Sequence, residues 1–554
     1  MNHRNIARKQ FIKRFHVVCG GIVATVFSLV LRVTCLQIIG FIKTSDTIQY
    51  ISPRSNNTRG MIFDRFNNPI SVSIPVQDIG LDLRKLSYPG EIKNNKRWQA
   101  LAEVLEIPLD KLCALISTHI SNHPQIHFMY IARQIRNPIA DYIKKLKLPG
   151  ICFNNGTRRY YPIGADTANL IGLTDIDGKG ISGIEQSFNS LLSGNLCNRI
   201  SQKNKMIKSC GTTRPQNITL SIDNRLQKIA YRALDDIVHL NKADSGCVVI
   251  IDVNTGEILS MANSPSYNPN NVTHTPQMLM RNYAITDIFE PGSTIKPLVL
   301  MLALQLKLVE ENSVINTLPY FIGKYLIRDV GYYKQLNLTG ILQKSSNVGV
   351  SRLALAMSIA SLSDTYYKFG LFQNTHTGLI GEKTGSMSKK HWSDIERATF
   401  SFGYGFTVTP LQLAQIYAII ATHGLARPLS IIKVNRPVPG KQIFPANIVK
   451  NVLHMMESVA LPGGVGIKAA VKGYRVAVKT GTVKKVGPNK HYINQYVAYT
   501  VGIAPVSNPR FALMVLINNP KVGEYYGGKV AAPVFSYIMT NVLRVMNVKP
   551  DALV

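Results

Sequence analysis

Ser293 and Lys296 are the residues whose types and spacing most directly suggest covalent chemistry in this chain of 554 residues. They stand in the segment Phe289-Glu-Pro-Gly-Ser-Thr-Ile-Lys-Pro297, and the apolar run 298–304 that follows is a predicted buried helix. Residues three apart at a helix start lie on one face. A serine hydroxyl becomes a nucleophile beside a base, and a lysine amine with a lowered pKa can be that base. Backbone N–H groups at the helix start can stabilise an oxyanion, so the pair predicts acyl transfer through serine.

Two further motifs follow along the chain in a fixed order. Ser345-Ser346-Asn347 comes directly before a predicted helix from Val348 to Met357. Lys479-Thr480-Gly481-Thr482 comes directly after the alternating strand Arg475-Val-Ala-Val478. A hydroxyl, an amide and a second amine are the groups that acyl transfer uses around a serine. The ordered set therefore predicts one active site.

Each motif also has weaker copies or plainer explanations when it is taken singly. Ser386-Met-Ser-Lys389 repeats the serine–lysine spacing, and Lys383-Thr-Gly385 repeats the later motif without a strand before it. A helix cap, a loop turn and a strand-end turn would explain the three motifs one at a time. Only the ordered combination favours catalysis.

The combination resembles class B penicillin-binding proteins, most closely the division-specific septal transpeptidases (penicillin-binding protein 3) of Gram-negative bacteria. The resemblance extends along the chain to flanking segments that we interpret as scaffold. These are Arg59-Gly-Met-Ile-Phe-Asp-Arg65, Arg158-Arg-Tyr-Tyr-Pro162, Gly183-Ile-Glu185, Asn263-Ser-Pro-Ser-Tyr-Asn-Pro-Asn270, Ser401-Phe-Gly-Tyr-Gly405 and Ala460-Leu-Pro-Gly-Gly464.

The resemblance implies a reaction and a role for each motif residue. The implied catalytic residues are Ser293, Lys296, Ser345, Asn347 and Lys479, and the implied substrate-binding residues are Thr480, Gly481 and Thr482. Ser293 would attack the bond between the terminal D-alanines of a peptidoglycan stem peptide, with Lys296 as base. Ser345 would relay a proton to the leaving amine, and Asn347 would orient the substrate amide. Lys479, Thr480 and Thr482 would hold the terminal carboxylate, and the N–H groups of Ser293 and Thr482 would form the oxyanion hole.

The implied partners are D-Ala-D-Ala stem peptides, β-lactams, a membrane-embedded SEDS-type glycan polymerase and other divisome proteins. A serine β-lactamase, a D,D-carboxypeptidase, a structural divisome protein with a vestigial site and an elongation-specific class B relative remain alternatives. A Ser-His-Asp hydrolase is disfavoured because no G-x-S-x-G occurs. Neither H-E-x-x-H, a Walker A loop nor a metal-ligand cluster occurs, so we expect no cofactor and no metal.

The elements that must position these motifs indicate an α+β fold. Strands at both ends of the catalytic region, with a helical middle, predict one sheet shared by the terminal segments. The resemblance implies a penicillin-binding-protein/serine β-lactamase-like domain, an antiparallel sheet with a helical subdomain, beside a non-catalytic α+β domain. The predicted strands are 218–222, 246–252, 257–261, 474–478, 496–503 and 511–517, and the predicted helices are 98–116, 223–241 and 532–545.

Composition excludes several classes of protein. A hydrophobic content of 45% excludes a disordered chain. The net charge of +32 reflects scarce acids rather than a dense basic run with interleaved aromatics, so no nucleic-acid partner is expected. The seven cysteines form no C-x-x-C pair, which disfavours a zinc ribbon or thioredoxin-like site.

The N-terminus predicts a membrane anchor. Five cations precede the apolar stretch 15–31, and the first acid is Asp46. Arg32 interrupts the run, which resumes over 33–42, and no small-residue cleavage site follows. The positive-inside rule places the N-terminus in the cytoplasm and the catalytic region in the periplasm, as a single-pass protein of the inner membrane. The predicted parts are a cytoplasmic tail (1–14), a transmembrane anchor (15–42), a periplasmic non-catalytic dimerisation or pedestal domain (43–215) and a transpeptidase domain (216–554).

Overall fold

The computed structural model describes residues 58–86, 91–194, 214–387, 392–487 and 491–552, with residues 32, 200–202, 205–207 and 489. The predicted cytoplasmic tail lies outside the described residues, as does the predicted anchor apart from Arg32. No helix in these described ranges is long and apolar enough to cross a membrane. Thr58–Gly194 and Arg214–Val554 form one compact unit. Met1–Asn57 and Asn195–Thr213 form the other, in which β5 (Ile200–Gln202) pairs with β6 (Lys205–Ile207).

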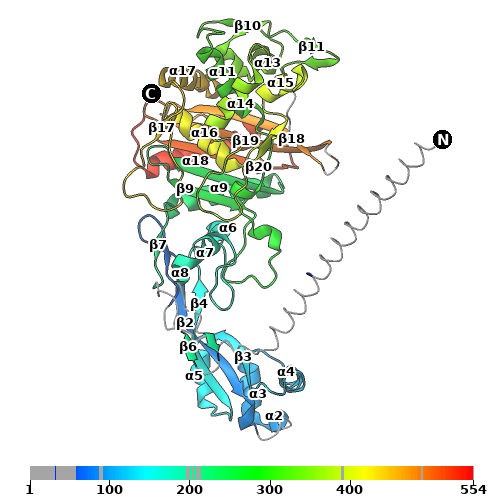
Figure 1. Cartoon of the computed structure of the whole chain (residues 1–554), viewed down its shortest axis with the longest axis vertical. Coiled ribbons are helices and arrows are strands. Elements are labelled where there is room, and N and C mark those ends of the chain that lie inside the picture. The colour runs from blue at the N-terminus through cyan, green and yellow to red at the C-terminus, as the bar shows by residue number, and fades with distance from the viewer. Residues whose placement is uncertain are drawn as a thin grey trace, which may run out of the picture. The chain divides into compact units, whose positions relative to one another are not determined.

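The first part of the large unit is built on a long strand, β2 (Pro69–Asp82), as Figure 1 shows. Its sheet has the order β3-β2-β1-β7, with β4 also paired to β2. Helices α3 and α4 bury Trp98, Leu101 and Ile116 in a separate small core behind this sheet. The elements are β1 (Ile62–Phe63), β3 (Phe128–Ile135), β4 (Ile151–Tyr160), β7 (Ile218–Thr219), α2 (Glu91–Asn94), α3 (Lys96–Val104), α4 (Leu109–Asn122), α5 (Asn137–Lys145), α6 (Ala168–Ile171), α7 (Gly183–Ser187) and α8 (Asn189–Ser193).

Two predictions for this region need correction. The helix predicted over 98–116 is two helices, because Glu106 takes a positive φ of 55° and Pro108 caps α4 instead of continuing α3. The strand predicted over 218–222 is only β7, two residues that pair in parallel with β1.

The second part contains an antiparallel sheet of order β18-β19-β20-β8-β9. The chain's later strands thus pair with its earlier hairpin, which confirms the predicted α+β layer. Successive strand residues point to opposite faces. A Cβ on Gly246 would meet α9, whereas the next residue, Cys247, lies on the face covered by Pro410 of α16. The elements are β8 (Ser245–Asp252), β9 (Ile258–Ser264), β18 (Ala477–Val486), β19 (Tyr492–Ala504), β20 (Phe511–Asn518), α9 (Asn224–Leu240), α16 (Pro410–Ala421) and α18 (Gly527–Val545).

A largely helical subdomain lies between β9 and β18 in the chain and packs its buried helix α11 into the main core. Every residue from Lys296 to Ala303 is buried, so this helix has no amphipathic face. The other elements are α10 (Tyr283–Thr286), α11 (Lys296–Gln305), α12 (Leu338–Lys344), α13 (Asn347–Leu355), α14 (Ile359–Lys368), α15 (Asp394–Ser401), α17 (Ala446–Glu457), and the paired strands β10 (Val314–Asn316) with β13 (Gln335–Asn337), β11 (Tyr320–Ile322) with β12 (Tyr325–Ile327), β14 (Ser386–Met387) with β15 (Phe406–Thr407), and β16 (Leu425–Ala426) with β17 (Lys441–Gln442).

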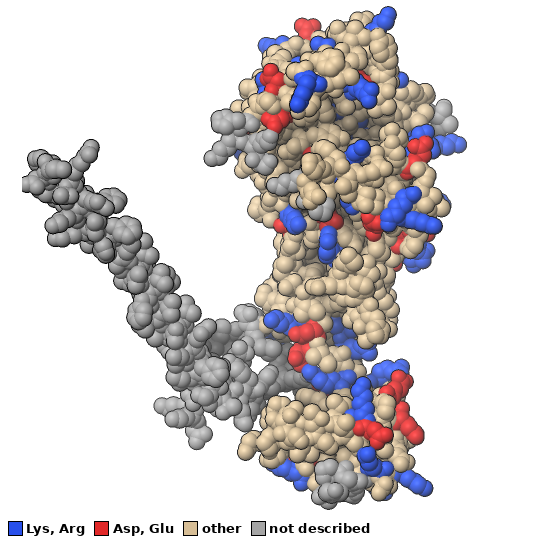
Figure 2. Space-filling model, turned by 90° about the vertical axis from the view of Figure 1, so that its right-hand side faces the viewer, with Lys and Arg blue, Asp and Glu red and all other residues tan. Residues whose placement is uncertain are grey.

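The excess positive charge is dispersed on the face shown in Figure 2. Lys and Arg side chains stand singly or beside Asp and Glu there, separated by neutral surface. This face therefore carries no continuous basic stripe.

Candidate active site

The segment that carries Ser293 is a tight turn that leads into a buried helix. Gly292 has a φ of +47°, and Gly292–Ile295 form a 3-10 turn before α11 begins at Lys296. A side chain at position 292 would put its Cβ 2.6 Å from Val483 Cγ1, so this turn requires glycine. Ser293 lies at the helical start, as predicted, but the first turn is 3-10 rather than α.

Lys296 is fully buried, and its amine contacts the second motif. Its Nζ donates to Ser345 O at 2.6 Å, Asn347 Oδ1 at 2.7 Å and Ser345 Oγ at 3.2 Å. Among the described residues, the Ser293 hydroxyl has no hydrogen-bond partner, and Ser293 is only half-buried. The nucleophile predicted from the sequence is therefore open to substrate, while the predicted base is held in place by its neighbours.

The Ser345 hydroxyl joins the second motif to the third. Lys479 Nζ donates to Ser345 Oγ at 2.9 Å, so the amines of Lys296 and Lys479 meet at one hydroxyl oxygen. Ser345 ends α12 in the left-handed conformation, with φ 57° and ψ 46°. This backbone turn places its side chain between α11 and β18. The structure thus brings together four of the predicted catalytic residues, Lys296, Ser345, Asn347 and Lys479.

The position of Lys479 within its strand differs from the prediction. The strand was expected to end at Val478, but β18 runs through the whole motif to Val486. Lys479 pairs in register with Val501 in β19, and its side chain is fully buried. The motif is therefore part of the sheet edge and is held by the ladder rather than by a turn.

Burial changes the charge state of both amines. Burial, reinforced by the neighbouring charge of Lys479, holds the pKa of Lys296 well below its usual range, and Asp329 partly opposes this. Burial lowers the pKa of Lys479 to about 7. Two ammonium groups beside one hydroxyl would repel each other without solvent screening. The site therefore favours one neutral amine, and a neutral amine can accept the proton of a serine hydroxyl.

Comparisons with known proteins agree with this site. Residues 246–540 match the penicillin binding protein transpeptidase domain, and residues 54–217 match the penicillin-binding protein dimerisation domain. The chain belongs to the penicillin-binding protein family. The class B resemblance predicted from the motifs is confirmed.

Named relatives extend this match along nearly the whole penicillin-binding protein. The chain is 54% identical over 550 residues to peptidoglycan D,D-transpeptidase FtsI of Escherichia coli (strain K12), covering 98% of this chain and 93% of that one. It is 51% identical over 554 residues to peptidoglycan D,D-transpeptidase FtsI of Buchnera aphidicola subsp. Schizaphis graminum, covering 98% and 96%. The apo structure of the TP domain of Burkholderia pseudomallei penicillin-binding protein 3 matches with a TM-score of 0.56 and 37% identity, covering 60% of this chain and 98% of that one.

The predicted substrate-binding residues of this penicillin-binding protein lie on the edge strand β18. Thr480 is nearly buried, and the Thr482 hydroxyl accepts a hydrogen bond from Gly527 N at 2.8 Å. A Cβ at Gly481 would lie 2.2 Å from the Tyr499 ring, so only glycine allows β18 to pack this closely against that ring. The strand therefore presents Thr482 beside the first residue of α18.

Sequence reasoning missed one carboxylate. Asp329 accepts hydrogen bonds from Ser346 Oγ at 2.5 Å, Asn347 N at 2.6 Å and Val348 N at 2.9 Å. It therefore caps the N-terminus of α13 from the segment that follows β12, and it supplies a negative charge near Lys296. No local spacing indicates this contact, because the capping residue usually directly precedes its helix.

Sequence reasoning also missed a tyrosine stack beside Thr482. Tyr525 stacks on Tyr496 with ring centroids 4.0 Å apart and on Tyr526 at 4.6 Å. Tyr526 directly precedes Gly527, the hydrogen-bond donor to Thr482. The sequence contains 24 tyrosines, and nothing in their positions indicates that these three would meet.

The competing copies of the motifs lie elsewhere. Ser386 is exposed on β14, where its N–H and hydroxyl contact Thr407, and its lysine, Lys389, lies outside the described residues. The backbone N–H of Lys383 donates a hydrogen bond to the carbonyl oxygen of Ile285. Within the described chain, neither copy contacts Lys296, Ser345 or Lys479.

Proposed function

We propose that this protein is a septal peptidoglycan D,D-transpeptidase that cross-links stem peptides in cell division through an acyl-enzyme on Ser293. The observation that carries the proposal is the meeting of two buried lysine amines at the Ser345 hydroxyl. One of these lysines, Lys296, follows the half-buried Ser293 by three residues. The two FtsI relatives, which align over nearly their full length, support the reaction and its place in division.

Acylation consumes a donor peptide and releases D-alanine. Ser293 Oγ attacks the carbonyl carbon between the two terminal D-alanines, and the neutral amine of Lys296 takes the hydroxyl proton. The backbone N–H groups of Ser293 and Thr482 stabilise the oxyanion, which is worth about 3–4 kcal/mol per donor in acyl-transfer enzymes. The C–N bond then breaks, and Ser345 passes a proton from the lysine pair to the leaving nitrogen.

Binding of the donor uses the edge strand and the second motif. Asn347 orients the substrate amide, and Lys479 provides the positive charge for the terminal carboxylate. Thr480 and Thr482 supply hydroxyls for that carboxylate, and Gly481 lets the donor backbone approach the strand. Because Lys479 is buried, its charge is weakly screened by solvent and acts strongly on the carboxylate.

An amine from a neighbouring stem peptide completes the reaction. It attacks the acyl carbonyl, the Ser293 ester bond breaks, and the serine recovers its proton as the cross-link forms. A β-lactam presents an amide and a carboxylate in a similar arrangement, so it acylates Ser293 and stays there. No step requires a metal or another cofactor.

The test is the position of a covalent adduct. Fluorescent penicillin should label the intact protein, and mass spectrometry should place the adduct on the peptide that contains Ser293. Ser293→Ala should abolish labelling without unfolding the chain, because the side chain is half-buried and has no hydrogen bond to a described residue. An adduct on Ser386 would overturn the assignment. Depletion that produced round cells instead of filaments would overturn the septal role.

The location follows from the N-terminal sequence. The cations at positions 4, 8, 9, 13 and 14 stay in the cytoplasm, the segment 15–42 crosses the inner membrane, and the catalytic region is periplasmic. Residues 43–215 form the non-catalytic domain and 216–554 the transpeptidase domain. A SEDS-type polymerase and other divisome proteins are the membrane partners. Protease added to spheroplasts should leave only a small membrane-bound fragment, whereas full protection would reverse this topology.

A further inference from the structure

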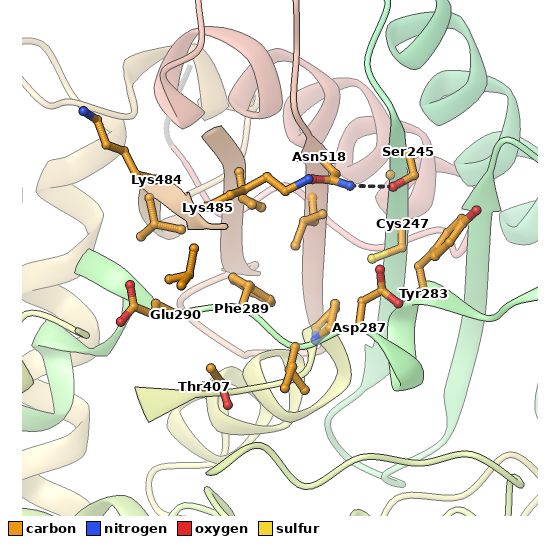
Figure 3. Close-up of a pocket in the computed structure, with 17 residues that line it drawn as sticks. Ser245, Cys247, Tyr283, Asp287, Phe289, Glu290, Thr407, Lys484, Lys485 and Asn518 are labelled. Carbon is orange, nitrogen blue, oxygen red and sulfur yellow. Dashed lines mark hydrogen bonds between the residues drawn. The ribbon is translucent and has the colours of Figure 1, made fainter. Parts of the chain in front are cut away.

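A cavity of about 350 Å³ lies beside the catalytic motifs and contains none of the predicted site residues. Its walls come from β8, β18, β19 and β20, from the segment before Ser293, and from single residues of α10, β15 and α16 (Figure 3). This volume lies at the lower end of the ~300–1,000 Å³ range of small-molecule sites. Ile288 and Val486, exposed by 43% and 52%, mark the side that opens to solvent.

The polar groups of the lining already have partners within the protein. Glu290 accepts hydrogen bonds from Gly405 N at 2.8 Å and Tyr492 OH at 3.0 Å. Asp287 binds Arg281 and Thr286. Asn518 donates to Ser245 at 3.0 Å, and Lys485 Nζ lies 3.9 Å from an Asp244 oxygen. A charged ligand is therefore not needed to neutralise or satisfy any of these groups.

The remaining lining is apolar. Phe289, Val483, Val497 and Leu516 present hydrocarbon surface, and Cys247 adds a free, fully buried thiol. Figure 3 shows Cys247 turned toward the space in front of Phe289, while the Lys484 side chain extends away from it. Burial raises the pKa of the Cys247 thiol, so it stays neutral. The free energy available to a ligand here is that of burying apolar surface.

Two residues of the cavity wall, Val483 and Phe289, also contact residues in or next to the segment that carries Ser293. Val483 directly follows Thr482 in β18 and packs against Gly292, where even a Cβ would lie only 2.6 Å from Val483 Cγ1. The Phe289 ring meets Tyr499 edge-on at 5.0 Å, and Tyr499 OH donates to Glu290 O at 3.3 Å. On the side away from the cavity these residues are close-packed, and close-packed protein interiors transmit strain. A ligand that displaces Val483 or Phe289 is therefore expected to shift Gly292 and the serine next to it.

We propose that this cavity is a regulatory site for a small, uncharged, largely apolar molecule, such as one with an aromatic ring, whose binding changes the rate of acylation at Ser293. The regulatory half of this inference rests on the proposed function, whereas the binding half does not. Binding and coupling therefore need separate measurements on the same full-length protein.

Binding is measured directly with indole, an uncharged aromatic probe, by ligand-observed saturation-transfer NMR on the full-length protein. Cys247→Phe should abolish saturable binding, because its ring would occupy the space toward which the Cys247 side chain is turned. Cys247→Ala, which leaves that space open, is the matched control and should still bind indole. No saturable binding by the normal protein, or unchanged binding by folded Cys247→Phe, would overturn the binding site.

Coupling is measured by acylation in the presence of indole. Saturating indole should change the second-order rate constant for fluorescent penicillin by about fivefold or more, the usual lower range of coupling between sites. The rate of Cys247→Phe, which should not bind indole, should not respond to it, whereas the rate of Cys247→Ala should respond as in the normal protein.

The outcomes separate the two proposals. Saturable indole binding with an unchanged acylation rate would overturn the regulatory role and leave binding intact. If penicillin failed to acylate even the untreated protein, the proposed function would fall, while indole binding would still report on the cavity.

Discussion

Replacing Asp329 tests whether a residue remote in sequence sets both the geometry and the protonation of the site. Its carboxylate accepts three hydrogen bonds from Ser346, Asn347 and Val348, which fix the turn that carries the Ser345 hydroxyl. Asp329→Asn keeps an acceptor for the two N–H groups but removes the charge and the acceptor for the Ser346 hydroxyl. Asp329→Ala removes all three bonds.

The expected magnitudes follow from the bonds lost. A hydrogen bond to a charged group contributes about 1.5–3 kcal/mol, and the partial exposure of Asp329 favours the lower value. Asp329→Asn should therefore slow acylation about tenfold, which corresponds to roughly 1.4 kcal/mol. Asp329→Ala should cost about 3 kcal/mol, or more than roughly a hundredfold, if the loss falls on the transition state.

The pH profile separates electrostatics from geometry. Asp329 stabilises the Lys296 ammonium and so raises its pKa against the larger lowering by burial and Lys479. Without Asp329 the pKa of Lys296 falls further, and because the neutral amine is the base, the acid limb of the acylation rate should move to lower pH. Lys479 and Asp329 are the charged groups that act on Lys296, and Lys479 is unchanged in the variant.

The assay is the acylation rate constant with fluorescent penicillin at saturating concentration, measured across pH. Asp223→Asn is the matched control, because Asp223 also caps a helix, α9, and its only described ion pair is with Arg225. It should alter stability without moving the acid limb. A wild-type rate in Asp329→Ala, or an equal loss at every pH in Asp329→Asn, would refute the assigned electrostatic role.

Two further predictions address the substrate carboxylate and the scaffold. Lys479→Ala should weaken both the affinity for the donor and the acylation rate. Replacing the donor carboxylate by its methyl ester should lower the acylation rate much less in this variant than in the normal protein. If the two losses in rate simply add in this double cycle, Lys479 does not bind the carboxylate. Glu185 is fully buried and accepts hydrogen bonds from Arg59 and Arg159 at 2.6 Å each. Glu185→Gln should therefore lower the free energy of unfolding, measured with denaturant, by about 3–5 kcal/mol. Asp141→Asn, which breaks the exposed ion pair with Lys144, is the control and should cost less than about 1 kcal/mol.

Much of the fold could be predicted because its sequence signals are local. The polar residue Asp223 before an amphipathic run correctly marked α9, whose first N–H groups it caps. The apolar runs at 246–252 and 511–517 matched β8 and β20, which pair along their whole length. Local signals failed at 98–116, where the helical periodicity continues through a break that Pro108 marks.

The candidate site was predictable in its motifs but not in its supports. The serine, amide and lysine residues stand in recognisable spacings, whereas Asp329 reaches α13 from the segment that follows β12 and Tyr525 reaches Tyr496 from the loop before α18. These contacts depend on tertiary packing, which brings together segments separated by many residues. The end of β18 was misplaced for a related reason: a lysine and a glycine disfavour a buried strand, and the pairing with β19 overrides that preference.

Ser345 shows why local rules fail at this site in particular. A left-handed conformation costs a non-glycine residue about 1–2 kcal/mol, so local energetics alone would favour glycine or asparagine there. Glycine lacks a hydroxyl, and the longer asparagine side chain would crowd the space that Lys296 and Lys479 share. Serine combines a small side chain with one oxygen that two amines can reach. Asp329 accepts hydrogen bonds from Ser346 and Asn347, the two residues that follow Ser345. These bonds hold the adjoining backbone and so help the surrounding structure to support the strained conformation of Ser345.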